Sequence, residues 1–336
     1  MYHLFSTFLL LINFSLYSFC NSTSKSNFSS VLNIKIPGFN DSGFLSWEIH
    51  ADKINKKEKS LIFAFNPSIY TYQNQKIQLT ANTSSGQFDL KSGSAWGNDS
   101  MVVAGDGFSG QGMGWHWLEK TSSGFNQIIF RNRAEITFLG GLNNSFTFDY
   151  QNEGRDCSPD DSTDEHVGNV KNPVPTIASA NYLEFLSVEE GVHRFLMDGN
   201  VSISGNNLHL TCEKVELLFI KDANESSGEI GRIKKIEALG NVVLSQRGRN
   251  SFANEMTLDV PNGTAELRGS LKSGKLARVV DDEWGEASGE KIILMKGKRM
   301  AKVVGNKDGR PRLELPPIPD FGFDLKKEIK KTKNVR

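Results

Sequence analysis

The sequence predicts an all-β protein whose short antiparallel strands stack on one another as a solenoid. The first observation is a series of short segments in which apolar and polar residues alternate, separated by Gly, Asn, Asp and Ser. This period is typical of half-buried strands, because successive side chains point to opposite faces of a sheet. The second observation is an internal repeat in the C-terminal half. The third is that no long amphipathic helical pattern precedes the C-terminal tail.

Length and composition limit the classes of function. The chain has 336 residues, enough for two domains of ordinary size or one long β-solenoid. Hydrophobic residues make up 38% of it, which predicts a modest core. The 39 Lys and Arg residues balance the 39 Asp and Glu residues, so the net charge gives no reason to expect nucleic acid as a partner.

The N-terminus, residues 1–20, is predicted to be a signal peptide for export. Leu4–Phe19 is mostly apolar and uncharged, and it is short for a membrane span of about 20 residues. Ser18 and Cys20 fit the small residues that precede a cleavage site. Cleavage is favoured over an uncleaved anchor, although no Lys or Arg precedes the apolar stretch. Acylation of Cys20 is disfavoured because Phe19 is bulky.

Two further cysteines, Cys157 and Cys212, leave two alternatives open. An exported compartment permits a disulfide between them, but sequence alone cannot show that they are close. Equally, Cys212 fits a small buried strand residue.

Residues 151–176 are expected to form a flexible linker or long loop. The segment is acidic, contains three prolines and has almost no apolar residues, so it cannot offset its ordering entropy by burial. It divides the chain into an N-terminal unit, 31–150, and a C-terminal unit, 177–315. Residues 316–336 are expected to form a basic, solvated tail. Seven segments of these units are expected to be strands: Val31–Ile36, Leu61–Phe65, Ile69–Tyr72, Lys76–Leu79, Met101–Ala104, Gln127–Arg131 and Glu135–Phe138.

The C-terminal unit repeats with an offset of 41 residues, at which Gly199–Ser204 matches Gly240–Ser245 and Cys212–Leu217 lies over Ala253–Leu258. A fixed period that carries two strands indicates hairpin units stacked on one another. The outermost strands of such a stack are unpaired edges, which tend to pair with another chain.

Alternation places one set of apolar side chains on a common face of these strands. Its members are Val201, Ile203, Leu208, Leu210, Val215, Leu217, Phe219, Val242, Leu244, Met256, Leu258 and Val260. Two interpretations follow: the faces close as an ordinary sandwich core, or they stay partly apart and line a groove for acyl chains. On the pattern alone the closed core is favoured, because apolar alternation occurs in every sheet core.

The ordered phrase Ile233–Val242, Ala253–Val260 and Asn262–Gly269 resembles the OstA/LptA-like domain of lipopolysaccharide-transport proteins. That phrase begins with a segment of basic and apolar residues, followed by Gly-Asn-Val and an alternating strand. A second strand with the pattern Ala-x-x-apolar-x-Leu comes next, and a Gly ends it. The similarity covers about 180–300. Less closely, Trp47–Lys53 and Met101–Gly107 resemble strands of LptC-like subunits.

The resemblance implies an antiparallel β-jelly-roll or "β-taco" fold, a periplasmic location and a role in outer membrane biogenesis. It implies a lipid-holding interior, with lipopolysaccharide or a related lipid as ligand. It also implies edge-to-edge assembly with other lipopolysaccharide-transport components; a homo-oligomer stays an alternative. The family has no catalytic residues, so we expect no enzyme and no cofactor. The chain departs from the usual single-domain form in having two units and an acidic insert.

Other motifs fit worse. Gly105–Gly110 matches the dinucleotide pattern G-x-G-x-x-G, but the residues after it disfavour the helix that holds pyrophosphate. The histidines have no metal-ligand spacing, so we expect no metal site. Two alternative functions remain. The second hypothesis is a non-enzymatic structural or adhesive surface β-solenoid, and the third is an exported carbohydrate-active β-solenoid enzyme.

Overall fold

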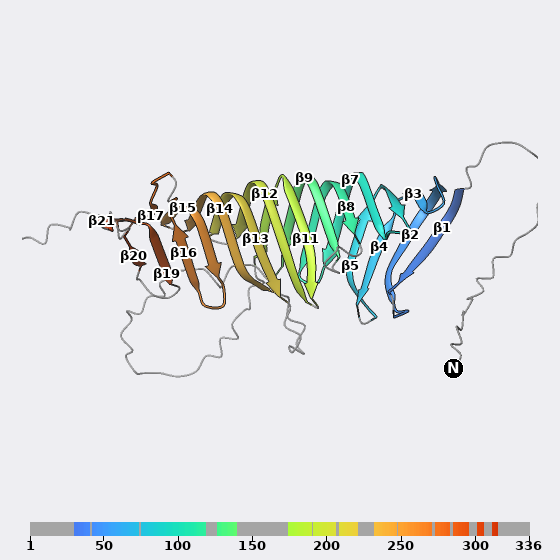
Figure 1. The fold of residues 1–336 in the computed structure, drawn as a ribbon, viewed down its shortest axis with the longest axis horizontal. Helices are drawn as coiled ribbons and strands as arrows, with labels where there is room; N and C mark the ends of the chain where they lie inside the picture. The colour runs from blue at the N-terminus through green and yellow to red at the C-terminus, as the bar shows by residue number, and fades with distance from the viewer. Residues whose placement is uncertain are drawn as a thin grey trace, which may run out of the picture.

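The computed structural model confirms the all-β prediction. It describes residues 30–40, 42–73, 75–118, 126–139, 174–189, 191–205, 208–220, 232–246, 248–270, 273–282, 285–295, 301–305 and 311–314. Within these ranges the chain forms 21 strands, which pair in antiparallel fashion, and no helix (Figure 1). The fold class is the antiparallel jelly-roll or "β-taco" kind that the resemblance implied.

The strands follow one another along the long axis of the molecule (Figure 1). Their bounds are β1 Ser30–Phe39, β2 Leu45–Lys56, β3 Leu61–Phe65, β4 Ser68–Gln73, β5 Lys76–Thr83, β6 Ser85–Asp89, β7 Ser94–Gly105, β8 Phe108–Leu118, β9 Gln127–Phe138, β10 Thr176–Ala180, β11 Tyr182–Glu189, β12 Val192–Gly205, β13 Leu208–Ile220, β14 Arg232–Gln246, β15 Arg249–Asp259, β16 Thr264–Arg268, β17 Ala277–Asp281, β18 Gly285–Gly289, β19 Lys291–Met295, β20 Ala301–Val304 and β21 Arg312–Glu314.

The long strands bend in the middle and cross from one sheet to another. The first half of β12 pairs with β11, and its second half pairs with β10. The bend falls at Gly199–Asn200, with φ of 76° and 52°, and β14 bends in the same way at Gly240–Asn241, with φ of 77° and 46°. Gly and Asn tolerate this left-handed conformation better than other residues. The Gly-Asn pair of the sequence repeat is therefore the point at which each strand folds over.

These bends lie along one line, which we call the spine; β1 bends there at Asn33, β8 at Gly114 and β9 at Arg133. The first sheet contains β3, β6, β11, β16, β19, β20 and one half of each bent strand. The second sheet contains β4, β5, β10, β17, β18, β21 and the other halves. On the side away from the spine, no strand pairing joins the two sheets among the described residues. We call that side the seam.

Each predicted strand segment lies in a strand of the structure, with one difference. Gln127–Arg131 and Glu135–Phe138 are two halves of a single strand, β9, which bends at Arg133 with φ of 49°. The alternation that indicates two strands is interrupted there because each half faces a different sheet.

Strands from the two predicted units share both sheets. β9 pairs with β10 through Ala134–Phe138 and with β11 through Gln127–Phe130, so the sheets continue from one unit into the next. The division into 31–150 and 177–315 stays a prediction. The signal peptide, most of the linker with Cys157, and the tail lie outside the described residues.

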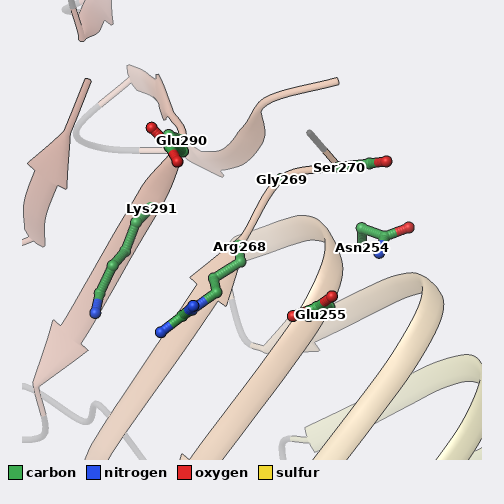
Figure 2. A pocket seen from close by; sticks show the side chains of 7 residues that line it. All are labelled: Asn254, Glu255, Arg268, Gly269, Ser270, Glu290 and Lys291. Atoms are coloured by element: carbon green, nitrogen blue, oxygen red, sulfur yellow. The ribbon is translucent and has the colours of Figure 1, made fainter. Parts of the chain in front are cut away.

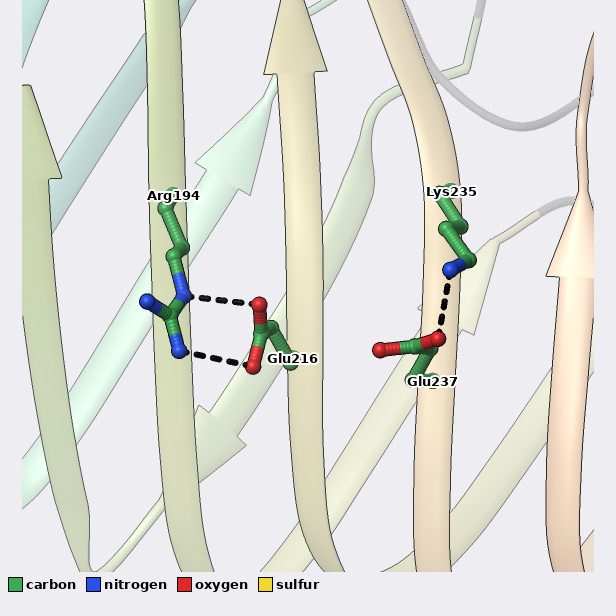
Figure 3. A network of polar contacts seen from close by, with 4 residues as sticks. All are labelled: Arg194, Glu216, Lys235 and Glu237. Carbon is green, nitrogen blue, oxygen red and sulfur yellow. Dashed lines mark hydrogen bonds and ion pairs between the residues drawn. The ribbon is translucent and has the colours of Figure 1, made fainter. Parts of the chain in front are cut away.

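The space between the sheets is apolar, and the outer faces are polar. Buried polar or charged side chains among the described residues are few: Thr71, Thr83, Thr176, His193 and Ser251. Charged pairs lie outside, as Figure 3 shows for Arg194, whose Nε lies 2.7 Å from Glu216 Oε1, and for Lys235, which binds Glu237. Exposed pairs of this kind contribute little to stability. An apolar ligand would find its matching surface between the sheets.

Candidate lipid-binding interior

The structure brings the twelve predicted side chains together between the two sheets. Eleven of them are at most 7% exposed, and Val260 is partly buried against the same core cluster. Val201, Ile203, Leu208, Leu210, Val242 and Leu244 come from the second sheet, and Val215, Leu217, Phe219, Met256, Leu258 and Val260 come from the first. Binding of acyl chains by these residues stays a prediction.

The protein's own side chains fill this interior closely. A small cavity lies between β4, β5, β7, β8 and β9, with Thr71 on its wall. The volume within which the centre of a water molecule could lie is about 10 Å³. That space is about the minimum for one water. Thr71 is 5% exposed and its hydroxyl has no hydrogen-bond partner. Such a cavity cannot hold an acyl chain, so lipid could enter between these five strands only if the two sheets moved apart there.

Aromatic side chains close the interior at mid-length. We call them the ring cluster: Phe108, Phe138, Phe185, His193, Phe195 and Phe219. Phe108 and Phe138 belong to the second sheet, and the other four belong to the first. Ring pairs at centroid separations of 4.5–7 Å contribute about 0.5–1.5 kcal/mol each beyond the burial of their area.

The contacts of the ring cluster cross between the sheets. The Phe108 centroid lies 5.3 Å from that of Phe185, 5.2 Å from Phe195 and 5.9 Å from Phe219. The Phe138 centroid lies 5.1 Å from Phe195 and 5.8 Å from Phe219. Phe108, Phe138 and Phe219 stand at strand ends next to the seam, so the rings close the seam as well as the interior.

His193 is the titratable member of the ring cluster. It is 6% exposed, and its Nδ1 atom is buried with no hydrogen-bond partner. Burial lowers the pKa of its imidazole from 6.5 to about 4, because a charged ring would lose its hydration among apolar neighbours. The ring is therefore neutral at pH 7.

Tryptophans line the interior near the N-terminal end. Trp115 and Trp117 lie two positions apart on β8, both point inward, and they are 1% and 4% exposed. Trp117 meets Trp47 of the second sheet edge to face, with centroids 6.3 Å apart. The Trp47 indole lies directly over Gly38 of β1, where a Cβ atom would come within 2.0 Å of the ring. Trp96 faces outward, beside His116.

Both ends of the stack present strand edges. β1 pairs with β2 alone, and Val31 and Leu32 on it are 47% and 67% exposed. At the other end, β20 pairs with β19 and β21 with β18, and no further strand follows them in the described ranges. Such edges are templates for another strand.

Comparison with solved structures finds proteins of similar fold. A crystal structure of LptH from Pseudomonas aeruginosa, described as the LptA homologous periplasmic component of the conserved lipopolysaccharide transport device, matches at 16% identity with a TM-score of 0.32. The match covers 43% of this chain and 96% of that chain. No family model matches the sequence, and no curated protein does.

A polar hollow of about 510 Å³ lies outside the interior, where β15, β16 and β19 meet (Figure 2). Arg268 and Lys291 on its wall both bind Glu266, with nitrogen-oxygen distances of 2.6 Å. The pKa of Glu266 is lowered, mainly by the hydrogen bond from Lys291 and further by the hydrogen bond from Arg268. Burial acts in the opposite direction and raises it. These cations already have a carboxylate partner, so the hollow shows no preference for an anionic ligand.

In the part of the chain that the structure describes, no arrangement of residues supports a dinucleotide site or a metal site. Gly105 and Gly107 belong to the turn from β7 to β8, and a strand rather than a helix follows them. No group of three His, Cys, Asp or Glu side chains could hold a metal ion within the described ranges. The search of those ranges also finds no helix with the length and apolarity to cross a membrane.

The ring cluster is the feature that sequence reasoning missed. The pattern identified Phe219, and it placed Phe138 at the end of a strand segment, but it could not join them. Phe108 stood inside the rejected glycine motif. Phe185, Phe195 and Phe219 lie within one stretch of the sequence, but their partners on β8 and β9 lie far away from it.

Proposed function

We propose that this chain is a periplasmic component of lipopolysaccharide binding and transport, which holds acyl chains between its two sheets. One observation carries the proposal. The interior is apolar along the stack, and continuous strands join the two sheets at the spine, whereas no strand pairing between described residues joins them at the seam. A container of this kind can open along one side without breaking a sheet. The OstA/LptA-like phrase in the C-terminal half supports the same function.

The energetics favour an apolar ligand in that space. Each Å² of apolar surface removed from water contributes roughly 25 cal/mol. An acyl chain between the sheets would replace side-chain contacts such as those of Leu217 and Leu258, which are 0% and 1% exposed. The cost of parting the sheets is therefore offset by new contacts of the same chemical kind.

Location and partners follow from the same proposal. The chain would be exported by residues 1–20 and would act in the periplasm, without catalysis of its own. Its edge strands, β1 at one end and β20 with β21 at the other, would pair with similar domains of other transport components or with a second copy. A separate ATPase would supply the driving force.

The experiment is photo-crosslinking in the intact exported protein. Benzoylphenylalanine replaces Trp47, which is 7% exposed and faces inward, or Trp96, which faces outward, as the matched control. After detergent-free purification and irradiation, mass spectrometry detects a crosslinked lipid or its absence. Crosslinking to lipid from position 47 and none from position 96 supports the proposal. Equal labelling at the two positions, or no lipid at either, contradicts it.

A second candidate is a non-enzymatic structural or adhesive surface solenoid. The close filling of the interior favours it, since the cavity beside Thr71 offers about 10 Å³. This alternative predicts that extracted protein carries no lipid and that its interior never accepts one. The same crosslinking experiment separates the two functions.

A further inference from the structure

The ring cluster joins the two sheets by several aromatic contacts next to the seam. Phe108 stands on the second sheet just after the β7–β8 turn, and Phe219 stands on the first sheet next to the end of β13. His193 reaches the same point from β12. Its ring lies 5.3 Å from Phe185, 5.6 Å from Phe108 and 6.1 Å from Phe219, measured between centroids.

We propose that the ring cluster is a latch that holds the seam closed at mid-length, and that protonation of His193 releases it. The inference rests on the proposed function only for its consequence, which is that release would admit lipid to the interior. The latch itself is a property of the protein alone.

The neighbours of His193 explain why a charge there would open the cluster. On β11, Ser187 lies opposite His193 in register, and the Phe185 ring contacts the His193 ring. The other neighbours are Phe219 of β13 and Phe108 of β8. None of these side chains ionises. The two ring faces and the buried Nδ1 therefore meet apolar surface, and an imidazolium would lack both water and a counter-ion there.

Charged groups on the same strands face away from the ring. Glu184, Arg194 and Glu216 lie on the outer face of the first sheet, where Arg194 and Glu216 bind each other. Asp106, in the turn before Phe108, is exposed. Burial is the cause of the lowered pKa of His193, and no nearby charge contributes to it. Opening the seam is then the available way for a protonated ring to regain water.

The direction of the pH effect follows from that lowered pKa. In the closed state the imidazole titrates at about 4, and once exposed it returns toward 6.5. The closed state is thus fully favoured above pH 6.5 and loses its advantage as the pH falls from 6.5 toward 4. Between pH 8 and pH 5 the opening equilibrium should rise about 30-fold.

The test is binding of the dye ANS, whose fluorescence reports exposed apolar surface, to the full chain without lipid at pH 8 and pH 5. We expect stronger dye fluorescence at pH 5, because opening the seam beside His193 and Phe219 exposes the apolar interior while the strand pairing of each sheet persists. His193→Phe keeps an aromatic ring that cannot ionise, so it should abolish the acid response. His209→Gln removes a histidine from the outer face of β13 and should leave the response unchanged.

Two results would overturn the latch: equal dye binding by the parent protein at both pH values, or the same acid response in His193→Phe. If phenylalanine disturbs folding, His193→Leu serves as the second non-ionising variant, with the same expectation. Because no lipid is present, an acid response that depends on His193 would stand even if crosslinking from position 47 found no lipid. If lipid were found in the interior but the protein showed no acid response, the latch proposal would be rejected and the proposed function would stand.

Discussion

Phe108 and Phe219 belong to opposite sheets, and their rings meet edge to face with centroids 5.9 Å apart. The contact joins strands that are 111 positions apart in the sequence. It closes the side of the molecule on which no strand pairing connects the sheets in the described residues. Stability at the seam therefore depends on side-chain packing, whereas at the spine it depends on continuous backbone.

Phe219→Ala should lower the free energy of unfolding by about 3–5 kcal/mol, the range for removing a buried aromatic side chain. Phe219 is 0% exposed and contacts Phe108, Phe138, Phe195 and His193, so the loss leaves a cavity at the seam. Urea unfolding measures the change. Leu239→Ala is the control, because Leu239 is 45% exposed and its truncation should change stability by no more than about 0.5 kcal/mol. Similar losses in the two variants would contradict the packing argument.

Gly240→Ala should destabilise the protein through two effects at the spine. The residue has φ of 77°, and an added Cβ atom would come 2.4 Å from Glu213 Oε2. The left-handed conformation costs a non-glycine residue roughly 1–2 kcal/mol, and the clash adds to this. Thermal unfolding should show a lower Tm than in the parent protein.

Gly274→Ala is the matched control for that variant, since Gly274 has φ of 67° and nothing within 4 Å of the added atom. It isolates the backbone cost. The double variant Gly240→Ala with Glu213→Ala should recover only part of the loss. It removes the carboxylate that clashes but keeps the Cβ atom of residue 213, which lies 2.8 Å from the added atom. An equal effect of the two glycine substitutions would show that the contact with Glu213 has no energetic weight.

Cys212 should react slowly with a thiol reagent in the native protein. It is 7% exposed, and burial raises the pKa of its thiol to about 12, so little reactive thiolate exists at pH 8. The measurement is alkylation of a Cys20→Ser, Cys157→Ser variant with iodoacetamide, followed by mass spectrometry. Addition of urea should make the reaction fast. Rapid labelling of the folded variant would mean that the interior opens at this strand.

Leu32→Lys should weaken association through the β1 edge without changing the fold. Leu32 is 67% exposed on the N-terminal edge strand, so a charge there costs little within the monomer. At an interface it would have to be buried, and charges on edge strands discourage pairing. Sedimentation of the purified protein, alone and mixed with a partner domain, measures association. Leu239→Lys places the same charge away from both ends and should have no effect.

The sequence predicted which side chains face inward, and it could not predict what they meet. Alternation is a local property, so Val215 and Leu217 were assigned correctly to a buried face. The partners of Phe108 are set by how two sheets pack across many strands, which alternation does not encode. Alternation also could not separate a closed core from a groove, because both have the same period.

The Gly-Asn pairs show a similar division. Gly199–Asn200 and Gly240–Asn241 were recognised as repeated units and were read as the start of a strand, whereas the structure places them in the middle of β12 and β14. A turn-forming pair usually ends a strand. Here positive φ at two successive residues redirects the strand while its pairing resumes beyond the bend.

Because every bent strand contributes to both sheets, each bent strand added along the stack lengthens the two sheets together. Each one extends the molecule by about 4.8 Å and leaves both terminal surfaces as they were. Duplication or loss of a hairpin would thus change the length of the strand stack in discrete steps. Two homologues of different span could then keep interchangeable ends.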